Sequence, residues 1–236
     1  MPPNRVRGAV SRGITKKTVT EAEPEPVERR DPARGSCDRR EEILDAATCL
    51  FAEHGFSDAV TQLLADRLGV GKGTLYRYFP SKRELFLAAA DRVMRRMQEQ
   101  VELSVKDATD PLDSIQRAVR TFLDFFKEHP EYVELLAQER ALFKDREKPT
   151  YLEHRERHVE RWRTLYRDQI SLGRVRKMSV ERISNVVVSA IYGAMFLNYS
   201  SGKSHAFEVR GEDILDVIFF GILSEPERRG RGADQA

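Results

Sequence analysis

Five basic residues and no acidic residue lie between Arg67 and Arg83, in a stretch that also carries threonine and tyrosine hydroxyl groups. Cationic and hydroxyl side chains bind phosphate oxygens, and a threonine side chain can also contact a base edge or a thymine methyl group. The stretch therefore predicts a surface for the nucleic-acid backbone. A solvated basic helix face would give the same charge pattern, so charge alone leaves both interpretations open.

Two short helices must position these side chains. Apolar spacing predicts helices over residues 61–68 and 72–79, with Gly69 permitting the turn between them. Leu75 and Phe79 stand four residues apart, so they share one face of the second helix and point into the core. Two short helices joined by a glycine-containing turn predict a helix-turn-helix.

The segment 38–89 resembles the DNA-binding domain of the TetR family of bacterial transcriptional repressors. The resemblance rests on Leu-Ala-x-x-Leu-Gly-Val at 64–70, Gly-Thr-Leu-Tyr-x-Tyr-Phe at 73–79 and the following Ser-Lys. Val60 departs from it, because many family members have Thr or Ser there, and we expect a weaker helix cap and one weaker phosphate contact. The resemblance implies that bases or nearby phosphates are contacted by Lys72, Gly73, Thr74, Tyr76 and Arg77, and that the DNA backbone is held by Thr61, Tyr78 and Lys82.

The rest of the chain reads as helices and predicts an all-α fold. Helical apolar periodicity runs from residue 38 to residue 223 without a convincing alternating strand, in about nine helices. Asp38, Ser81 and Asp110 are the predicted N-caps of three of them. The expected organisation is a disordered basic arm (1–36), a helix-turn-helix domain (37–84), an effector-binding and dimerisation domain built as a helical bundle (85–224) and a disordered tail (225–236). The arm could touch DNA, be a solvated tail or be a transit peptide.

Two helices near the end of the chain are apolar on nearly every side. They are predicted over 183–199 and 214–223, and a helix that is apolar all round must be buried all round. A homodimer that packs both pairs as a four-helix bundle would bury them, although a large single-chain core is the alternative. The expected interface residues are Val187, Ile191, Met195, Ile218 and Ile222.

Aromatic residues on three predicted helices favour an apolar pocket for a small effector. The expected lining residues are Phe122, Phe126, Trp162, Tyr166, Tyr192 and Phe196. The absence of an obvious buried acid pair favours an apolar or aromatic effector over a cation, although Glu134 and Glu139 remain as possible counter-charges.

Other site chemistries are poorly supported. The stretch 69–74 lacks the spacing of a phosphate-binding loop, because Gly73 follows Lys72 where Ser or Thr is required. His154 and His158 have the four-residue spacing of metal ligands, but no third ligand accompanies them. Cys37 and Cys49 form neither a disulfide framework nor a zinc ligand set. We therefore expect no enzyme, no metal and no cofactor.

Composition indicates a globular chain outside the membrane. The 236 residues (27.1 kDa) are 40% apolar and 33% charged, and the longest apolar run is interrupted by polar residues before it reaches the roughly 20 residues of a bilayer span. The first residues lack the apolar region of a secretory signal, so a cytoplasmic location is expected.

Together these features predict a ligand-responsive transcriptional repressor that binds a near-palindromic, double-stranded DNA operator as a homodimer. Three alternatives stay open: an effector-independent or activating DNA-binding regulator, a metal-binding or catalytic helical protein, and an architectural DNA protein.

Overall fold

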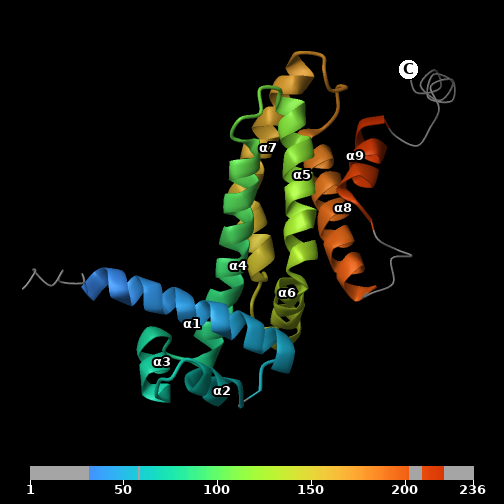
Figure 1. Cartoon of the computed structure of the whole chain (residues 1–236). Helices are drawn as coiled ribbons and strands as arrows, with labels where there is room; N and C mark the ends of the chain where they lie inside the picture. The colour runs from blue at the N-terminus through green and yellow to red at the C-terminus, as the bar shows by residue number, and fades with distance from the viewer. Residues whose placement is uncertain (1–31, 58, 202–208, 221–236) are drawn as a thin grey trace, which may run out of the picture.

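The computed structural model describes residues 32–57, 59–201 and 209–220, and within these residues every regular element is an α-helix (Figure 1). The all-α prediction is confirmed. The helices are α1 (Pro32–His54), α2 (Ala59–Arg67), α3 (Lys72–Tyr78), α4 (Lys82–Val105), α5 (Pro111–Glu128), α6 (Pro130–Leu142), α7 (Thr150–Ser171), α8 (Val180–Ser200) and α9 (Gly211–Phe220).

The helices form two parts (Figure 1). Helices α1, α2 and α3 make a small unit at one end, and α5, α7, α8 and α9 lie in the elongated bundle at the other. Helix α4 belongs to both, because it packs against α1 in the small unit and against α5 and α7 in the bundle. The predicted domain boundary at residues 84/85 therefore falls within the first turn of one continuous helix.

Two predicted helix starts are confirmed by their capping hydrogen bonds. The Ser81 hydroxyl accepts from the backbone N–H of Glu84 (3.1 Å), and the Asp110 carboxylate accepts from the N–H of Leu112 (2.9 Å). Each cap satisfies an N–H that the first turn of a helix leaves without a backbone partner. These caps fix where α4 and α5 begin.

The start of α1 differs from the prediction. The helix begins at Pro32 rather than at residue 38, so residues 32–36 of the expected arm have helical backbone. A proline is tolerated in the first turn, where its missing N–H would have no partner, and alanine and arginine are good helix formers. Residues 1–31 of the expected arm and the expected tail at 225–236 lie outside the described residues.

A cluster of four phenylalanines joins the small unit to the bundle. The rings of Phe51, Phe56, Phe86 and Phe143 come from α1, the segment after it, α4 and the segment after α6, with centroid separations of 4.9 to 5.9 Å. Edge-to-face pairs of this kind stabilise beyond the burial of their area. The junction is therefore packed rather than a loose linker.

Helix α4 also connects the two parts through charge. Arg92 is only 8% exposed, and its guanidinium donates to Glu41 and, at 2.6 Å, to Asp45, both on α1. The preceding residue, Asp91, lies 2.8 Å from His154 of α7. One turn of α4 thus holds the small unit on one side and the bundle on the other.

Helix α8 is long and apolar enough to cross a membrane by length and composition alone. Core helices of globular proteins pass the same test, and α8 packs against α5, α6, α7 and α9. Its contacts are those of a bundle helix.

Candidate functional site

Helix α3 presents its predicted contact residues on its outer side. Lys72, Gly73, Tyr76 and Arg77 are exposed, and Thr74 and Tyr78 are half-buried. The opposite side is anchored, since Leu75 and Phe79 are 2% and 4% exposed. Six of the eight predicted DNA-contacting residues therefore share one accessible surface, which we call the α3 surface and define as Lys72, Gly73, Thr74, Tyr76, Arg77 and Tyr78.

The turn before α3 contains the expected Gly69 and is also held by two residues of α1, Arg39 and Arg40, that the sequence did not mark. Gly69 has φ of +63°, which favours glycine, and the Val70 N–H donates to the Ala65 carbonyl at 2.9 Å. From α1, the Arg39 guanidinium donates to the Leu68 carbonyl at 2.9 Å. Arg40 lies 5.0 Å from the centre of the Phe79 ring. Helix α1 therefore fixes both the turn and the end of α3.

Two residues predicted to contact the DNA backbone, Thr61 and Lys82, do not belong to the α3 surface. Thr61 is 5% exposed and therefore buried. The Lys82 ammonium donates to the Ser57 carbonyl (2.8 Å) and lies 4.2 Å from the centre of the Phe56 ring. Lys82 thus holds the segment between α1 and α2, a role that spacing along the chain could not reveal.

Gly73 has open space around it. A Cβ atom added there would meet no atom of the described chain within 4 Å. Its small size is therefore not required by the packing of the described residues, and the space above it is available to a partner.

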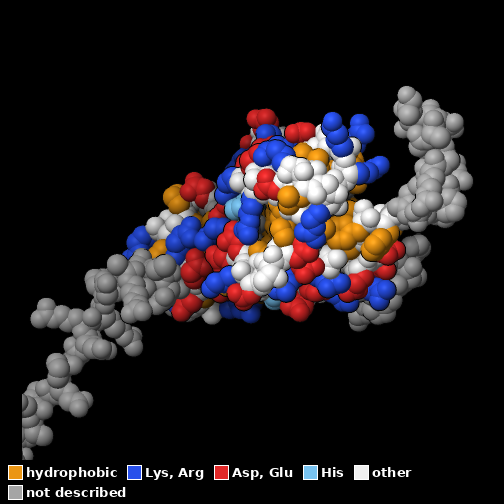
Figure 2. All heavy atoms as spheres, turned by 90° about the horizontal axis from the view of Figure 1, so that it is seen from above, with side chains coloured by type: hydrophobic (Ala, Val, Ile, Leu, Met, Phe, Trp, Pro, Cys, Tyr) orange, Lys and Arg blue, Asp and Glu red, His pale blue; other side chains and the backbone are white. Residues whose placement is uncertain are grey.

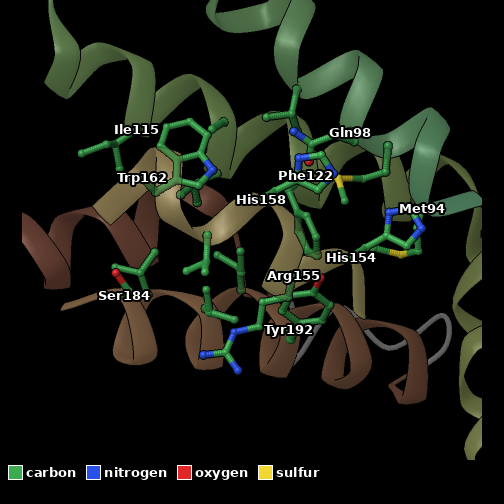
Figure 3. A pocket seen from close by; sticks show the side chains of 18 of the residues that line it. Met94, Gln98, Ile115, Phe122, His154, Arg155, His158, Trp162, Ser184 and Tyr192 are labelled. Carbon is green, nitrogen blue, oxygen red and sulfur yellow. The ribbon is translucent and has the colours of Figure 1, made fainter. Parts of the chain in front are cut away.

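A second candidate site is a partly open cavity of about 110 Å³ bounded by α4, α5, α7 and α8 (Figure 3). Four of the six aromatic residues expected there line it: Phe122, Trp162, Tyr166 and Tyr192. The other two do not line it. Phe126 packs on Phe122 and Phe125, with both ring separations at 5.1 Å, and Phe196 packs on Tyr151 at 5.9 Å. The partners of Phe126 belong to its own helix, α5, whereas the partner of Phe196 belongs to α7.

The cavity is mainly apolar, with a few polar groups in its wall. Burial raises the pKa of Tyr166 to about 12, and it also raises the pKa of Tyr192, so both phenols stay protonated at neutral pH. The other polar lining residues are Gln98, His154, Arg155, His158 and Ser184 (Figure 3). None of the described residues that line the cavity is acidic.

The two histidines considered as metal ligands lie in this wall. His154 is 3% exposed, and its Nε2 lies 2.8 Å from the Asp91 carboxylate. The hydrogen bond from His154 is the main cause that lowers the pKa of Asp91 to about 2. Burial, followed by the neighbouring His154, lowers the pKa of His158. No group of three potential ligands that could hold a metal occurs among the described residues.

The two glutamates considered as counter-charges lie elsewhere. Glu139 is 1% exposed and caps α7, accepting from the Thr150 N–H at 2.9 Å and from Arg146 at 2.8 Å. Burial raises the pKa of Glu139 despite these partners. Glu134 accepts from the Tyr199 hydroxyl. Neither lines the cavity.

Helices α8 and α9 combine a buried and an exposed apolar side. Val187 and Met195, both expected at a dimer interface, are 9% and 3% exposed and pack inside the chain, while Ile191 and Ile218 are half-buried. Ile222 lies outside the described residues. The exposed large apolar residues are Val186 and Leu197 of α8 (both 57%) and Val217 and Phe220 of α9 (52% and 65%). Figure 2 shows hydrophobic side chains gathered on the side of α8 and α9, and we call these four residues the α8/α9 face.

Sequence likeness to known proteins covers part of this chain. The sequence pattern described as bacterial regulatory proteins, tetR family, matches residues 43–89. Nucleoid occlusion factor SlmA of Mannheimia succiniciproducens is 29% identical over 126 residues, 53% of this chain and 58% of that protein. The HTH-type transcriptional activator FasR of Mycolicibacterium smegmatis is 36% identical over 90 residues, 38% of this chain and 41% of that protein. The chain spans about half the length of these curated relatives.

Likeness in fold extends over most of the chain. The TetR family transcriptional regulator PfmR of Thermus thermophilus has a TM-score of 0.59 and 24% identity, over 77% of this chain and 99% of that one. At that identity the likeness shows the fold alone. Residues 43–89 therefore carry the sequence pattern of bacterial regulatory proteins, tetR family, in a helix-turn-helix, and the helices of the chain have the arrangement of a TetR-type fold.

Proposed function

We propose that this protein is a cytoplasmic, ligand-responsive transcriptional repressor that binds a near-palindromic DNA operator as a homodimer. The observation that carries the proposal is the α3 surface, where exposed cationic and hydroxyl side chains stand on a helix whose other side is anchored. Such a helix can place its outer side in the major groove while its inner side stays packed against the rest of the domain. Phosphate contacts would come from Lys72 and Arg77, and base contacts from Thr74 and the backbone at Gly73.

Dimerisation is proposed through the α8/α9 face. Exposed apolar residues side by side on two helices can be buried against the same face of a second copy, giving a two-fold symmetric four-helix bundle. Two α3 helices would then need to lie about 34 to 36 Å apart, or a multiple of that spacing, to meet half-sites on one side of the duplex.

The dimer is tested with Leu197→Glu, which places a charge on the α8/α9 face. We expect this variant to sediment as a monomer and to lose cooperative operator binding. Leu172→Glu is the matched control, because Leu172 is 68% exposed at the end of α7, away from this face. A dimer that survives Leu197→Glu but not Leu172→Glu would place the interface elsewhere.

The cavity is the proposed effector site. Its apolar wall suits an apolar or aromatic molecule. An effector that binds the free protein better than the DNA complex lowers operator affinity, and by linkage DNA lowers effector affinity by the same factor. The relative FasR is named as an activator, so an activating or effector-independent role is the second candidate. Operator occupancy with and without ligand separates the two.

A catalytic role is not proposed. The described residues include an Asp91–His154 pair, in which His154 is buried and lines the cavity, and a buried serine, Ser184, in the same cavity wall. The Ser184 hydroxyl and the second nitrogen of His154 have no hydrogen-bond partner among the described residues, so they are not bonded to each other. An activated nucleophile requires such a bond.

The first experiment is selection of bound duplexes from a random library at moderate salt, with the oligomeric state measured in parallel. We expect a two-fold symmetric site and a dimer. Salt-sensitive binding without a motif would contradict sequence-specific regulation and favour an architectural DNA protein.

A further inference from the structure

The wall of the cavity contains two buried polar atoms that the chain itself does not satisfy. These are Nδ1 of His154 and the hydroxyl oxygen of Ser184, and each residue is 3% exposed. Buried polar atoms nearly always have a partner, because leaving one unpaired costs free energy. Figure 3 shows the two residues at opposite ends of the cavity, with Trp162 and Phe122 among the side chains between them.

The proton arrangement at His154 follows from its other contact. The Asp91 carboxylate is ionised at neutral pH, since its pKa is about 2, and an ionised carboxylate only accepts hydrogen bonds. Nε2 of His154 must therefore carry the hydrogen that it shares with Asp91. In a neutral imidazole the remaining nitrogen, Nδ1, is then an acceptor.

The surroundings of Nδ1 contain no acceptor. A hydrogen on Nδ1 would point at no acceptor among the described residues, and a buried N–H without a partner is costly. The described lining holds no acidic residue, and its one guanidinium, on Arg155, donates to Asn185 at 2.8 Å. The cavity thus offers an apolar lining with a fixed hydrogen-bond acceptor at one end.

We propose that the cavity binds an uncharged, ring-sized apolar molecule that bears a hydroxyl group, and that this hydroxyl donates to Nδ1 of His154. The inference rests on the proposed effector site and not on the α3 surface. The cavity volume of about 110 Å³ suits one ring, since an apolar cavity of about 150 Å³ is known to admit benzene. An alcohol or a phenol fits this site, and a carboxylate does not, because it has no hydrogen to donate.

Three single-ring probes separate the chemistries: p-cresol has a donating hydroxyl, 4-methylanisole has the same oxygen without its hydrogen, and 4-methylbenzoate carries a charge. Trp162 is the only tryptophan of the chain and lines the cavity, so its fluorescence reports occupancy in the full-length protein, with calorimetry as a second readout. We expect p-cresol to bind about tenfold more tightly than 4-methylanisole, the worth of one hydrogen bond. The benzoate should bind most weakly.

Two variants test the residue assignment. His154→Phe keeps a ring but removes the acceptor, and it should bring the affinities for p-cresol and 4-methylanisole to within about twofold. Asp91→Asn lies behind the cavity wall and no longer dictates which nitrogen carries the hydrogen, so it should reduce the same preference. His129→Phe is the matched control outside the cavity and should keep the tenfold preference. Circular dichroism confirms that each variant is folded.

Failure of the inference and failure of the proposed site give different results. Equal affinities for p-cresol and 4-methylanisole in the unmodified protein, or tightest binding of the benzoate, would overturn the hydroxyl inference and leave the cavity as a ligand site. If none of the probes changes Trp162 fluorescence or releases heat, both the effector site and the inference are overturned. Neither result bears on operator selection, which is measured separately.

Discussion

The α3 surface and the cavity are built in opposite ways. The α3 surface comes from one seven-residue helix, and its side chains are exposed, cationic and hydroxylic. The cavity comes from α4, α5, α7 and α8, and its apolar walls enclose a few polar groups. Affinity at the first depends on charge and falls with salt, whereas affinity at the second depends on shape and on single hydrogen bonds. The α3 surface can be altered one residue at a time, but the shape of the cavity changes whenever any of its four helices shifts.

The largest expected effect tests whether the α3 surface depends on its buried side. Leu75→Ala should lower the free energy of unfolding by about 2 to 5 kcal/mol, because Leu75 is 2% exposed and its loss leaves a void under α3. Chemical denaturation measures this loss. The control is Leu63→Ala on α2, where Leu63 is 40% exposed and the change should stay within about 0.5 kcal/mol. Equal effects would mean that α3 is not anchored by Leu75.

The next effect should separate the cavity from DNA binding. Ala118 lines the cavity from α5, and Ala118→Met would fill space that a single-ring probe needs. We expect probe affinity to fall roughly a hundredfold and operator affinity to change less than about twofold. Calorimetry and an operator-binding assay measure the two quantities on the same preparation. Equal losses in both would show that the cavity and the α3 surface cannot be treated as separate sites.

A smaller effect tests the open space above α3. Gly73→Ala should leave the free energy of unfolding unchanged or raise it, because alanine favours the helix and meets no neighbouring atom. Operator affinity should fall about tenfold if DNA occupies that space. Leu103→Ala on α4 is the control, since Leu103 is 69% exposed and lies outside both α3 and the α8/α9 face. Unchanged operator affinity in Gly73→Ala would place the DNA further from the α3 backbone.

The smallest effect concerns single phosphate contacts. Lys72→Ala should reduce the slope of log affinity against log salt by about one and weaken all DNA sequences alike. Lys82→Ala provides the comparison, because its ammonium donates to Ser57 and its loss should also lower the melting temperature. If Lys82→Ala lowers the salt slope as much as Lys72→Ala does, Lys82 contacts phosphate in addition to holding this segment.

The two regions also differ in how well the sequence predicts them. Which residues of α3 face outward follows from helical periodicity once Leu75 and Phe79 are assigned to the core, and six of eight expected residues lie on the α3 surface. Thr61 and Lys82 do not lie on the α3 surface, because contacts across α1, α2 and α4 decide their environment. No spacing within one helix contains that information.

The cavity was predictable only in part because helix packing decides which aromatic residues face it. Phe126 and Phe196 are expected there, but Phe126 packs on other rings of α5 and Phe196 packs on Tyr151 of α7. His154 and His158 were considered only as metal ligands, although they precede Trp162 and Tyr166 at intervals of four residues and so share one face of α7. That spacing was the available signal for placing them in the wall. On α8, Val186 is exposed and its neighbour Val187 is buried, a difference that apolar composition alone could not show.

The adjacent residues Asp91 and Arg92 bear on how this protein could be redesigned as a sensor. They hold α7 and α1 from a single turn of α4, so this turn must be kept if a ligand signal is to reach the helix-turn-helix unit. Most of the cavity wall lies on α5, α7 and α8, whose lining residues can be exchanged without altering the ion pairs to α1. Ligand preference can therefore be engineered separately from the output, with the α4 turn left unchanged.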